Sequence, residues 1–192
     1  MLKQFAKSFA MLLVMIVLTG IAYPLVITGL AQIIFPHQAN GSLVYKGGQV
    51  VGSQLIGQNF NDPKYFQSRP SAAGKNGYDA TASGGSNLGP TNKEFLNSVA
   101  ERANNIRQQN GLSPNQAVPS DLVTASASGL DPDITPAGAM IQIPRIAKLR
   151  NLSAETVKNL VQRNTASPQL GIFGEPRVNV LQLNLDLDNL TK

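Results

Sequence analysis

The sequence predicts an α+β protein with a single N-terminal transmembrane helix followed by one mixed α+β soluble domain. Three observations carry this prediction: residues 9–35 hold no Asp, Glu, Lys, Arg or His, residues 42–58 show a hairpin pattern, and three later segments repeat apolar residues at helical spacing. The strand and helix patterns do not alternate as βαβ units, which is typical of α+β folds. A length of 192 residues allows one soluble domain of ordinary size.

The composition excludes several kinds of chemistry. The chain has no cysteine and one histidine, so zinc ribbons, iron–sulfur clusters, disulfide scaffolds, cysteine nucleophiles and histidine-rich metal sites are excluded. We therefore predict no catalytic residues and no metal site. The formal net charge is +5, and residues 36–192 carry 14 basic and 11 acidic side chains. Because the basic residues are not concentrated in one place, a nucleic-acid partner is not expected.

The N-terminal apolar segment is long enough to cross a membrane. As a helix, residues 9–35 would rise about 40 Å, which exceeds the roughly 30 Å hydrocarbon core of a bilayer. The alternative is a cleaved signal peptide, with Gly20 and Ala22 as the small residues before a cut at Tyr23. Signal peptides have apolar regions of only about 7 to 15 residues. We therefore predict a permanent anchor.

One stripe of this helix suits contact with another membrane helix. Gly20, Pro24, Thr28 and Ala31 recur at intervals of four, four and three residues, and small residues let membrane helices approach closely. Pro24 removes a backbone hydrogen bond and is expected to bend the helix, a fault that neighbouring helices can repair. These four residues are the predicted partner interface in the membrane. Small residues are also common in any spanning helix, so a surface that contacts lipid alone is the alternative.

The charges around the span predict its orientation. Lys3 and Lys7 precede it, and the next basic residue is Lys46. Positive charge favours the cytoplasmic side of a membrane. The predicted organisation is therefore a cytoplasmic N-terminus at residues 1–8, a transmembrane helix at 9–35 and an extracytoplasmic, periplasmic α+β domain at 36–192.

The soluble domain is predicted to open with a β-hairpin and to end in a strand. Two strand-like segments within residues 42–58 flank Gly47-Gly48, a pair that favours the positive backbone angles of a two-residue turn. At the other end, residues 177–188 alternate apolar and polar side chains, but the alternation changes parity after Val180. We predict a strand to about Leu185, with a bulge or a strand-to-helix change at the parity shift.

Three helices are predicted between these strands. The first ends at Asn110-Gly111 and has Glu94 three residues after its N-cap, as in a capping box. Pro144 is expected to kink or break the second. Each helix follows a residue whose hydroxyl suits an N-cap: Thr91, Thr135 and Ser153.

Residues 58–91 are predicted to form an ordered loop that folds over the domain or docks onto a partner, with docking favoured as at least part of its role. The loop has 34 residues without periodicity, and such loops are commonly functional or disordered. Four of the chain's eleven aromatic residues lie in it, and aromatic side chains seek burial or a partner surface. The predicted partner-interface residues of the loop are Phe60, Tyr65, Phe66 and Arg69.

Ser83-Gly84-Gly85-Ser86 is the predicted nucleotide-binding segment. It lies shortly before a capped helix, where amide groups and the helix dipole can attract an anion. It lacks the Lys-Ser/Thr of a P-loop, and it is nearer the signature loop of ABC-type ATPases without that loop's Leu and Gln. The alternative, which the pattern by itself favours, is that the glycines and Pro90 only form turns.

A membrane-anchored exported serine hydrolase is the alternative function. Its nucleophile would need a general base nearby, but the sole histidine, His37, directly follows the span. Lys75 is four residues from the nearest serine, which does not match Ser-x-x-Lys. The candidate nucleophiles of such a hydrolase are Ser71, Ser83 and Ser86.

Seven short motifs follow one another from the span almost to the C-terminus. They are Tyr23-Pro-Leu-x-x-Thr28-Gly, Phe35-Pro-x-x-Ala39-Asn-Gly-Ser-Leu43, Gly52-Ser-x-Leu-Ile-Gly-Gln-x-Phe60, Tyr65-Phe-x-x-Arg69-Pro-Ser-Ala72, Ser83-Gly-Gly-Ser-Asn-Leu88, Asp121-Leu-Val-Thr-Ala-Ser-Ala-Ser-Gly-Leu-Asp131 and Val178-Asn-Val-Leu-x-Leu-Asn184. As an ordered set they resemble the KdpC family, the C subunits of bacterial Kdp potassium-transporting P-type ATPases.

The resemblance implies a non-catalytic accessory subunit of a high-affinity potassium uptake complex in the bacterial inner membrane. The implied partners are a potassium-translocating channel-like subunit, a P-type ATPase subunit and a very small hydrophobic subunit, in addition to membrane lipid. The family is described as a catalytic chaperone that raises the ATP affinity of the ATPase subunit. It does so through a transient ternary complex with ATP, without a tightly bound cofactor.

The predicted orientation of the chain conflicts with the predicted contact between Ser83 and ATP. If residues 36–192 lie outside the cell, Ser83 cannot meet cytoplasmic ATP. We therefore expect any effect on the ATPase subunit to pass through membrane-helix packing or potassium entry. A nucleotide-binding module that faces the cytosol is the alternative, and it would reverse the predicted orientation.

Overall fold

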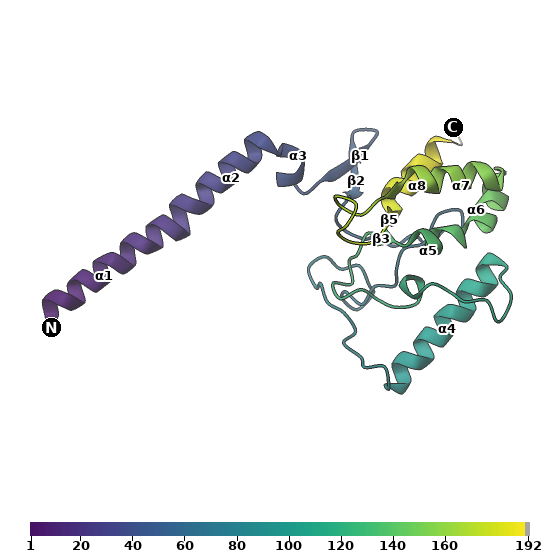
Figure 1. Cartoon of the computed structure of the whole chain (residues 1–192), viewed down its shortest axis with the longest axis horizontal. Helices are drawn as coiled ribbons and strands as arrows, with labels where there is room; N and C mark the ends of the chain where they lie inside the picture. Colours follow the sequence, from purple (N-terminus) through teal and green to yellow (C-terminus); the bar gives the residue numbers. More distant parts are fainter. Residues whose placement is uncertain (191–192) are drawn as a thin grey trace. The chain divides into compact units, whose positions relative to one another are not determined.

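The chain consists of two compact units, Met1–Val51 and Gly52–Lys192. The computed structural model describes residues 1–190. The first unit holds a long helix, and the second holds five α-helices and a small sheet within its described residues (Figure 1). An apolar helix followed by mixed helices and strands confirms the predicted α+β class.

One helix of 33 residues, Leu2–Ile34, occupies most of the first unit. It comprises α1 (Leu2–Val17), a π-helical turn (Leu18–Ala22) and α2 (Tyr23–Ile34), and none of its residues is buried. By length and composition it can cross a membrane, and within residues 1–190 it is the one helix that can.

The helix continues through Pro24 by widening one turn. Pro24 lies in the first turn of α2, directly after the π-helical segment. There the N–H of Tyr23 donates to the carbonyl of Leu18, five residues earlier in the chain. Pro24 has no N–H, so it interrupts the α-helical series of hydrogen bonds between residues four apart. In the π-turn the hydrogen bond spans five residues instead of four. The irregularity expected at this proline therefore takes the form of a π-turn.

The predicted hairpin follows a short helix, α3 (Pro36–Ala39). Its strands are β1 (Leu43–Lys46) and β2 (Gln49–Ser53), and Gly47 and Gly48 both have positive φ angles, as predicted. The prediction of a second strand as far as residue 58 is wrong. The strand ends at residue 53, where the hydroxyl of Ser53 accepts a hydrogen bond from the N–H of Leu55 and the chain turns.

The three predicted helices are present, with one correction at a cap. The first is α4 (Lys93–Asn110), and its N-cap is Asn92 rather than Thr91, because the Asn92 side chain accepts from the N–H of Phe95. Thr135 and Ser153 cap their helices as predicted. The interruption expected at Pro144 separates α5 (Pro136–Met140) from α6 (Ile143–Arg150), and α7 (Ala154–Arg163) follows.

The prediction of a strand to Leu185 is wrong. The strand β5 (Arg177–Asn179) ends at the parity shift, and α8 (Val180–Asn189) begins there. Asn179 causes the change, since its side chain accepts from the N–H of Gln182 and caps the new helix. Of the two outcomes expected at the shift, the strand-to-helix change is therefore the one that occurs.

A three-stranded antiparallel sheet lies beside these helices. Its order is β3-β5-β4, with β3 (Asp133–Ile134) and β4 (Thr165–Ala166) on either side of β5. The sequence analysis missed both outer strands, because two residues are too few to show alternation.

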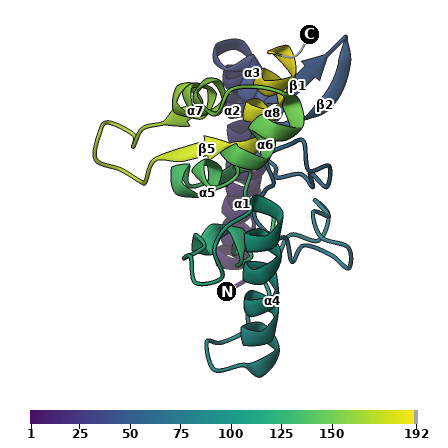
Figure 2. The same ribbon diagram turned by 90° about the vertical axis from the view of Figure 1, so that its right-hand side faces the viewer.

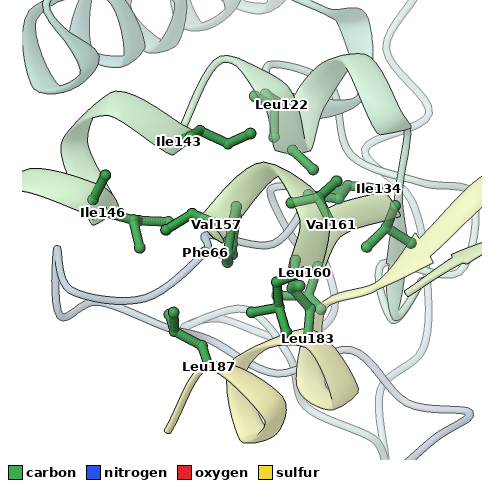
Figure 3. Close-up of a cluster of buried hydrophobic side chains, with 14 of the residues drawn as sticks. Phe66, Leu122, Ile134, Ile143, Ile146, Val157, Leu160, Val161, Leu183 and Leu187 are labelled. Atoms are coloured by element: carbon green, nitrogen blue, oxygen red, sulfur yellow. The ribbon is translucent and has the colours of Figure 1, made fainter. Parts of the chain in front are cut away.

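One hydrophobic core joins the helices of the second unit. Helix α7 contacts α5, α6 and α8. Figure 3 shows side chains from α6, α7 and α8 around Phe66, which comes from the long loop. The fully buried residues of this core, each with at most 1% of its surface exposed, are Phe66, Ala139, Ile146, Val157, Val161, Val178, Val180, Leu183 and Leu187.

Candidate functional site

The 58–91 loop is fixed at residues 66 and 67 by a polar side chain of α8 and by the N-cap residue of α6. Asn184 of α8 accepts from the N–H of Phe66 at 2.8 Å and donates to the carbonyl of Phe66 at 3.0 Å. Gln142, which precedes α6, makes the same pair of bonds with the main chain of Gln67, at 2.8 and 3.3 Å. These amides satisfy the loop backbone as a neighbouring strand would. The loop is therefore ordered without being part of a sheet.

Arg145 of α6 completes this attachment. Its guanidinium donates to the side chains of Asn110 at 2.9 Å and Gln142 at 2.8 Å, and to the main-chain carbonyls of Tyr65 at 3.1 Å and Pro63. These acceptors are all neutral. Burial lowers the pKa of Arg145 to about 10, so the side chain is charged at neutral pH. A buried cation thus ties the loop to α4 and α6.

The aromatic residues predicted to meet a partner lie at different depths. Phe66 has no exposed surface, and Phe60 is partly buried against the core. Tyr65 is also partly buried, with its ring centroid 6.0 Å from that of Phe60. The Tyr65 hydroxyl donates to Asp188 at 3.2 Å, and the guanidinium of Arg150 lies 4.6 Å above the Tyr65 ring. A partner contact through Phe66 would require this side chain to leave the core.

Arg69, the fourth predicted interface residue of the loop, pairs with Asp131 at 2.8 Å. Its Nε is buried and makes no hydrogen bond. The Arg69–Asp131 pair connects the loop to the segment before β3, so this ion pair has a structural role. The assignment of these four loop residues to a partner interface stays a prediction.

The hydroxyl of Tyr78 is expected to ionise only in strongly alkaline solution. Burial raises the pKa of Tyr78 to about 12 from 10.0. The unfolded chain therefore loses this proton near pH 10 and the folded domain near pH 12, so the protein loses stability as the pH rises between these values. A spectrophotometric titration should show a tyrosine with a pKa near 12 that the Tyr78→Phe variant lacks. Two identical titration curves would contradict the assignment.

The predicted nucleotide-binding segment packs along a neighbouring stretch of backbone. The hydroxyl of Ser83 and the N–H of Gly84 both donate to the carbonyl of Ser128, at 3.0 and 2.8 Å. A Cβ on Gly85 would lie 3.1 Å from the carbonyl oxygen of Ala127. Gly85 therefore allows two backbones to approach closely, whereas a Cβ on Gly84 would have no atom nearer than 4.0 Å. Ser86 is exposed, and the nucleotide-binding assignment stays a prediction.

Gly129 allows the closest approach in this region, and its replacement by Ala should be costly. Its φ is +67°, and a Cβ would lie 2.6 Å from the carbonyl oxygen of Gly84 and 2.7 Å from the N of Ala73. Gly129→Ala should lower the free energy of unfolding by about 3 kcal/mol, from overpacking and left-handed strain together. Gly171→Ala is the matched control, because φ is +75° and no atom lies within 4 Å.

The control separates the two causes. Gly171→Ala should cost only about 1 kcal/mol, from strain alone. Urea unfolding of the full chain in detergent, followed by pulse proteolysis, measures both values. Equal losses in the two variants would show that the close approach to Gly84 does not occur.

Two of the three serines considered as nucleophiles, Ser71 and Ser83, donate to main-chain carbonyls. Ser71 donates to the carbonyl of Gly129 at 2.5 Å, and Ser83 donates to Ser128 as described above. Neither hydroxyl donates to a side chain that could act as a general base. Within residues 1–190, no three His, Cys, Asp or Glu side chains gather to hold a metal ion.

The predicted membrane stripe lies on the long helix. Gly20 falls within the π-helical turn, and Pro24, Thr28 and Ala31 follow on α2. None of the four is buried, and a Cβ on Gly20 would meet nothing within 4 Å. The stripe can therefore accept a neighbouring helix, and its assignment as a partner interface stays a prediction.

Comparison with known proteins gives one consistent result. Residues 5–189 match the family model described as KdpC: K+-transporting ATPase, c chain. The Potassium-transporting ATPase KdpC subunit of Gemmatimonas aurantiaca is 53% identical over 191 residues, which are 100% of this chain and 95% of the relative. The KdpC subunit of Acidobacterium capsulatum is 59% identical over 174 residues, which are 91% of this chain and 91% of the relative. The KdpC subunit of Mycobacterium tuberculosis is 52% identical over 190 residues, which are 99% of this chain and 100% of the relative. The chain therefore belongs to the KdpC family.

Proposed function

We propose that this chain is a non-catalytic accessory subunit of an ATP-driven potassium uptake complex. It assembles with a potassium-translocating subunit, a P-type ATPase subunit and a small hydrophobic subunit, and stabilises the pump. The match to the KdpC family over residues 5–189 is the observation that carries the proposal. The long helix, which buries none of its residues, supports a membrane anchor that packs against other subunits.

The same proposal places the N-terminus in the cytoplasm and the α+β domain outside the inner membrane. Lys3 and Lys7, before the apolar segment, support this orientation. The chain then raises the ATP affinity of the ATPase subunit without touching cytoplasmic nucleotide through Ser83. The effect reaches that subunit through packing of the membrane helix.

A matched pair of glycine variants tests the role of the helix. Gly20 lies on the predicted stripe and Gly29 lies off it, and a Cβ on either would meet nothing within 4 Å in the isolated chain. Gly20→Leu should reduce recovery of the other subunits with the tagged full chain about tenfold, because a bulky residue blocks close helix approach. Gly29→Leu should leave recovery unchanged. Full recovery with both variants would reject the stripe as the interface.

Orientation and nucleotide contact are tested separately. A reporter that is active in only one compartment, fused after Lys192, should be active outside the cytoplasm. In the assembled pump, replacing Ser83 and Ser86 with Ala should leave the KM for ATP unchanged, whereas omission of the whole chain should raise it. A reporter active in the cytoplasm, together with a raised KM in the serine variant, would support a nucleotide-binding module that faces the cytosol.

A further inference from the structure

The loop between β4 and β5 carries the most exposed large apolar side chains of the described α+β domain. Leu170, Ile172 and Phe173 have 89, 79 and 63% of their surface exposed. They belong to the tip of this loop, which the Gln169–Phe173 bridge closes, and the loop between β4 and β5 extends away from the helices on the left of Figure 2. Large exposed apolar groups gathered in one place mark an interaction site more often than scattered ones do.

The tip is ordered by its own hydrogen bonds. Gln169 and Phe173 exchange both main-chain bonds, at 2.8 and 2.9 Å, and form an antiparallel bridge. The N–H of Gly171 donates to the carbonyl of Pro168 at 3.0 Å. Leu170 takes a positive φ of 53°, which is costly for a branched side chain. A tip that is closed in this way loses little conformational freedom when it binds.

The charge around the tip favours a protein pocket over a lipid surface. Residues 164–174 contain no ionisable side chain, and residues 163–177 contain no Lys, Trp or Tyr. Arg177, at the base of the loop, pairs with Asp133 at 3.0 Å. Segments that insert at a membrane surface usually carry basic residues for anionic lipid and Trp or Tyr at the interface. An uncharged, apolar pocket is the complementary surface for this tip.

The size of the tip indicates which protein provides the pocket. Stable dimers usually bury about 1,200–2,000 Å², and three side chains cannot supply that area. A small anchor is effective where a second attachment already holds the two proteins together and raises their effective concentration. In this chain the apolar helix Leu2–Ile34 is that second attachment.

We propose that Leu170, Ile172 and Phe173 insert into an apolar pocket on the extramembrane surface of another subunit of the transporter. This inference rests on the proposed function, because it requires the chain to assemble with membrane-embedded subunits. The tip then fixes the α+β domain on its partner, and the membrane helix provides the first contact. Like other interface hot spots, the three side chains act as a compact group of anchors.

Photocrosslinking identifies the occupant. A photoreactive amino acid is placed at Ile172 of the full chain, expressed with the other subunits, and at Leu96 as a control. Leu96 lies on α4 with 50% of its surface exposed. The residue at position 172 should crosslink to another subunit, and the residue at 96 should not. Adducts only with lipid, or only with a second copy of this chain, would overturn the proposal.

A variant with polar tip residues measures the contribution of the anchor. Leu170→Asn, Ile172→Thr and Phe173→Thr are combined, because Asn tolerates the positive φ angle and Thr suits an extended segment. The triple variant should dissociate from the purified complex about tenfold faster than the wild type, and Leu96→Ser should not. An unchanged dissociation rate in a variant that unfolds at the wild-type urea concentration would overturn the proposal. If the wild-type chain itself fails to assemble, the proposed function is wrong and the inference falls with it.

Discussion

Replacing Phe66 with Ala is expected to lower the free energy of unfolding by about 4 kcal/mol, because a large aromatic side chain leaves a cavity in a close-packed core. Phe66 has no exposed surface and lies among side chains from α6, α7 and α8 (Figure 3). Its N–H and carbonyl stay bonded to Asn184, so the loss comes from the ring rather than from the backbone. Urea unfolding of the full chain in detergent, read by pulse proteolysis, measures it.

Two variants define the cause of this loss. Phe66→Leu keeps most of the volume and should cost only about 1 kcal/mol. Leu96→Ala removes apolar atoms from an exposed position on α4 and should change stability by less than about 0.5 kcal/mol. A Phe66→Ala variant as stable as the wild type would contradict the core position. If that variant also lost its partner subunits, the prediction of a docking aromatic would regain support.

The buried position of Phe66 bears on how a long loop is interpreted from sequence. The aromatic content of residues 58–91 correctly predicted an ordered segment, since such side chains require burial or a partner. Sequence alone could not decide between the two, because the residues that hold the loop lie far from it in the chain. Asn184 is 118 positions from Phe66 and Gln142 is 75 positions from Gln67. Nothing local in the sequence of either pair indicates their contact.

Local signals succeeded where a few adjacent residues determine the structure. Gly47-Gly48 fixed the hairpin turn, and Thr135 and Ser153 capped their helices as expected. The errors at Asn92 and Asn179 have one cause in common, since in both cases an asparagine side chain caps the next helix. At Asn92, the neighbouring Thr91 is also a common N-cap residue type, although asparagine is the stronger one.

The candidate surfaces were harder to predict than the fold. The apolar tip at Leu170, Ile172 and Phe173 was not singled out, because three apolar residues beside a β-strand resemble core residues until their exposure is known. A signal was present in the sequence. The glycines at 171 and 174 predict a turn, and a turn places apolar neighbours at the surface.

Arg145→Met is the second substitution with a large expected effect. We expect a loss of about 4 kcal/mol in the free energy of unfolding, because hydrogen bonds to charged groups contribute more than neutral ones and buried acceptors are costly to leave unpaired. Met matches the apolar part of the side chain but leaves the buried side-chain oxygen of Asn110, and the carbonyls of Pro63 and Tyr65, without their donor. The 58–91 loop should open first, so hydrogen exchange at residues 64–67 should rise before exchange in α7 does.

The size of this effect distinguishes a buried attachment from a surface charge. Lys158→Met removes a cation from α7, where the Lys158–Glu155 pair is 3.9 Å long and exposed, and it should cost no more than about 0.5 kcal/mol. Arg145→Lys keeps the charge but loses the forked geometry that reaches Asn110, Gln142 and the loop carbonyls together, so it should fall between the two. If the lysine variant were as stable as the wild type, charge alone would hold the loop. If the Arg145→Met variant were as stable as the wild type, the free-energy cost of burying the guanidinium would equal the stabilisation from all its hydrogen bonds.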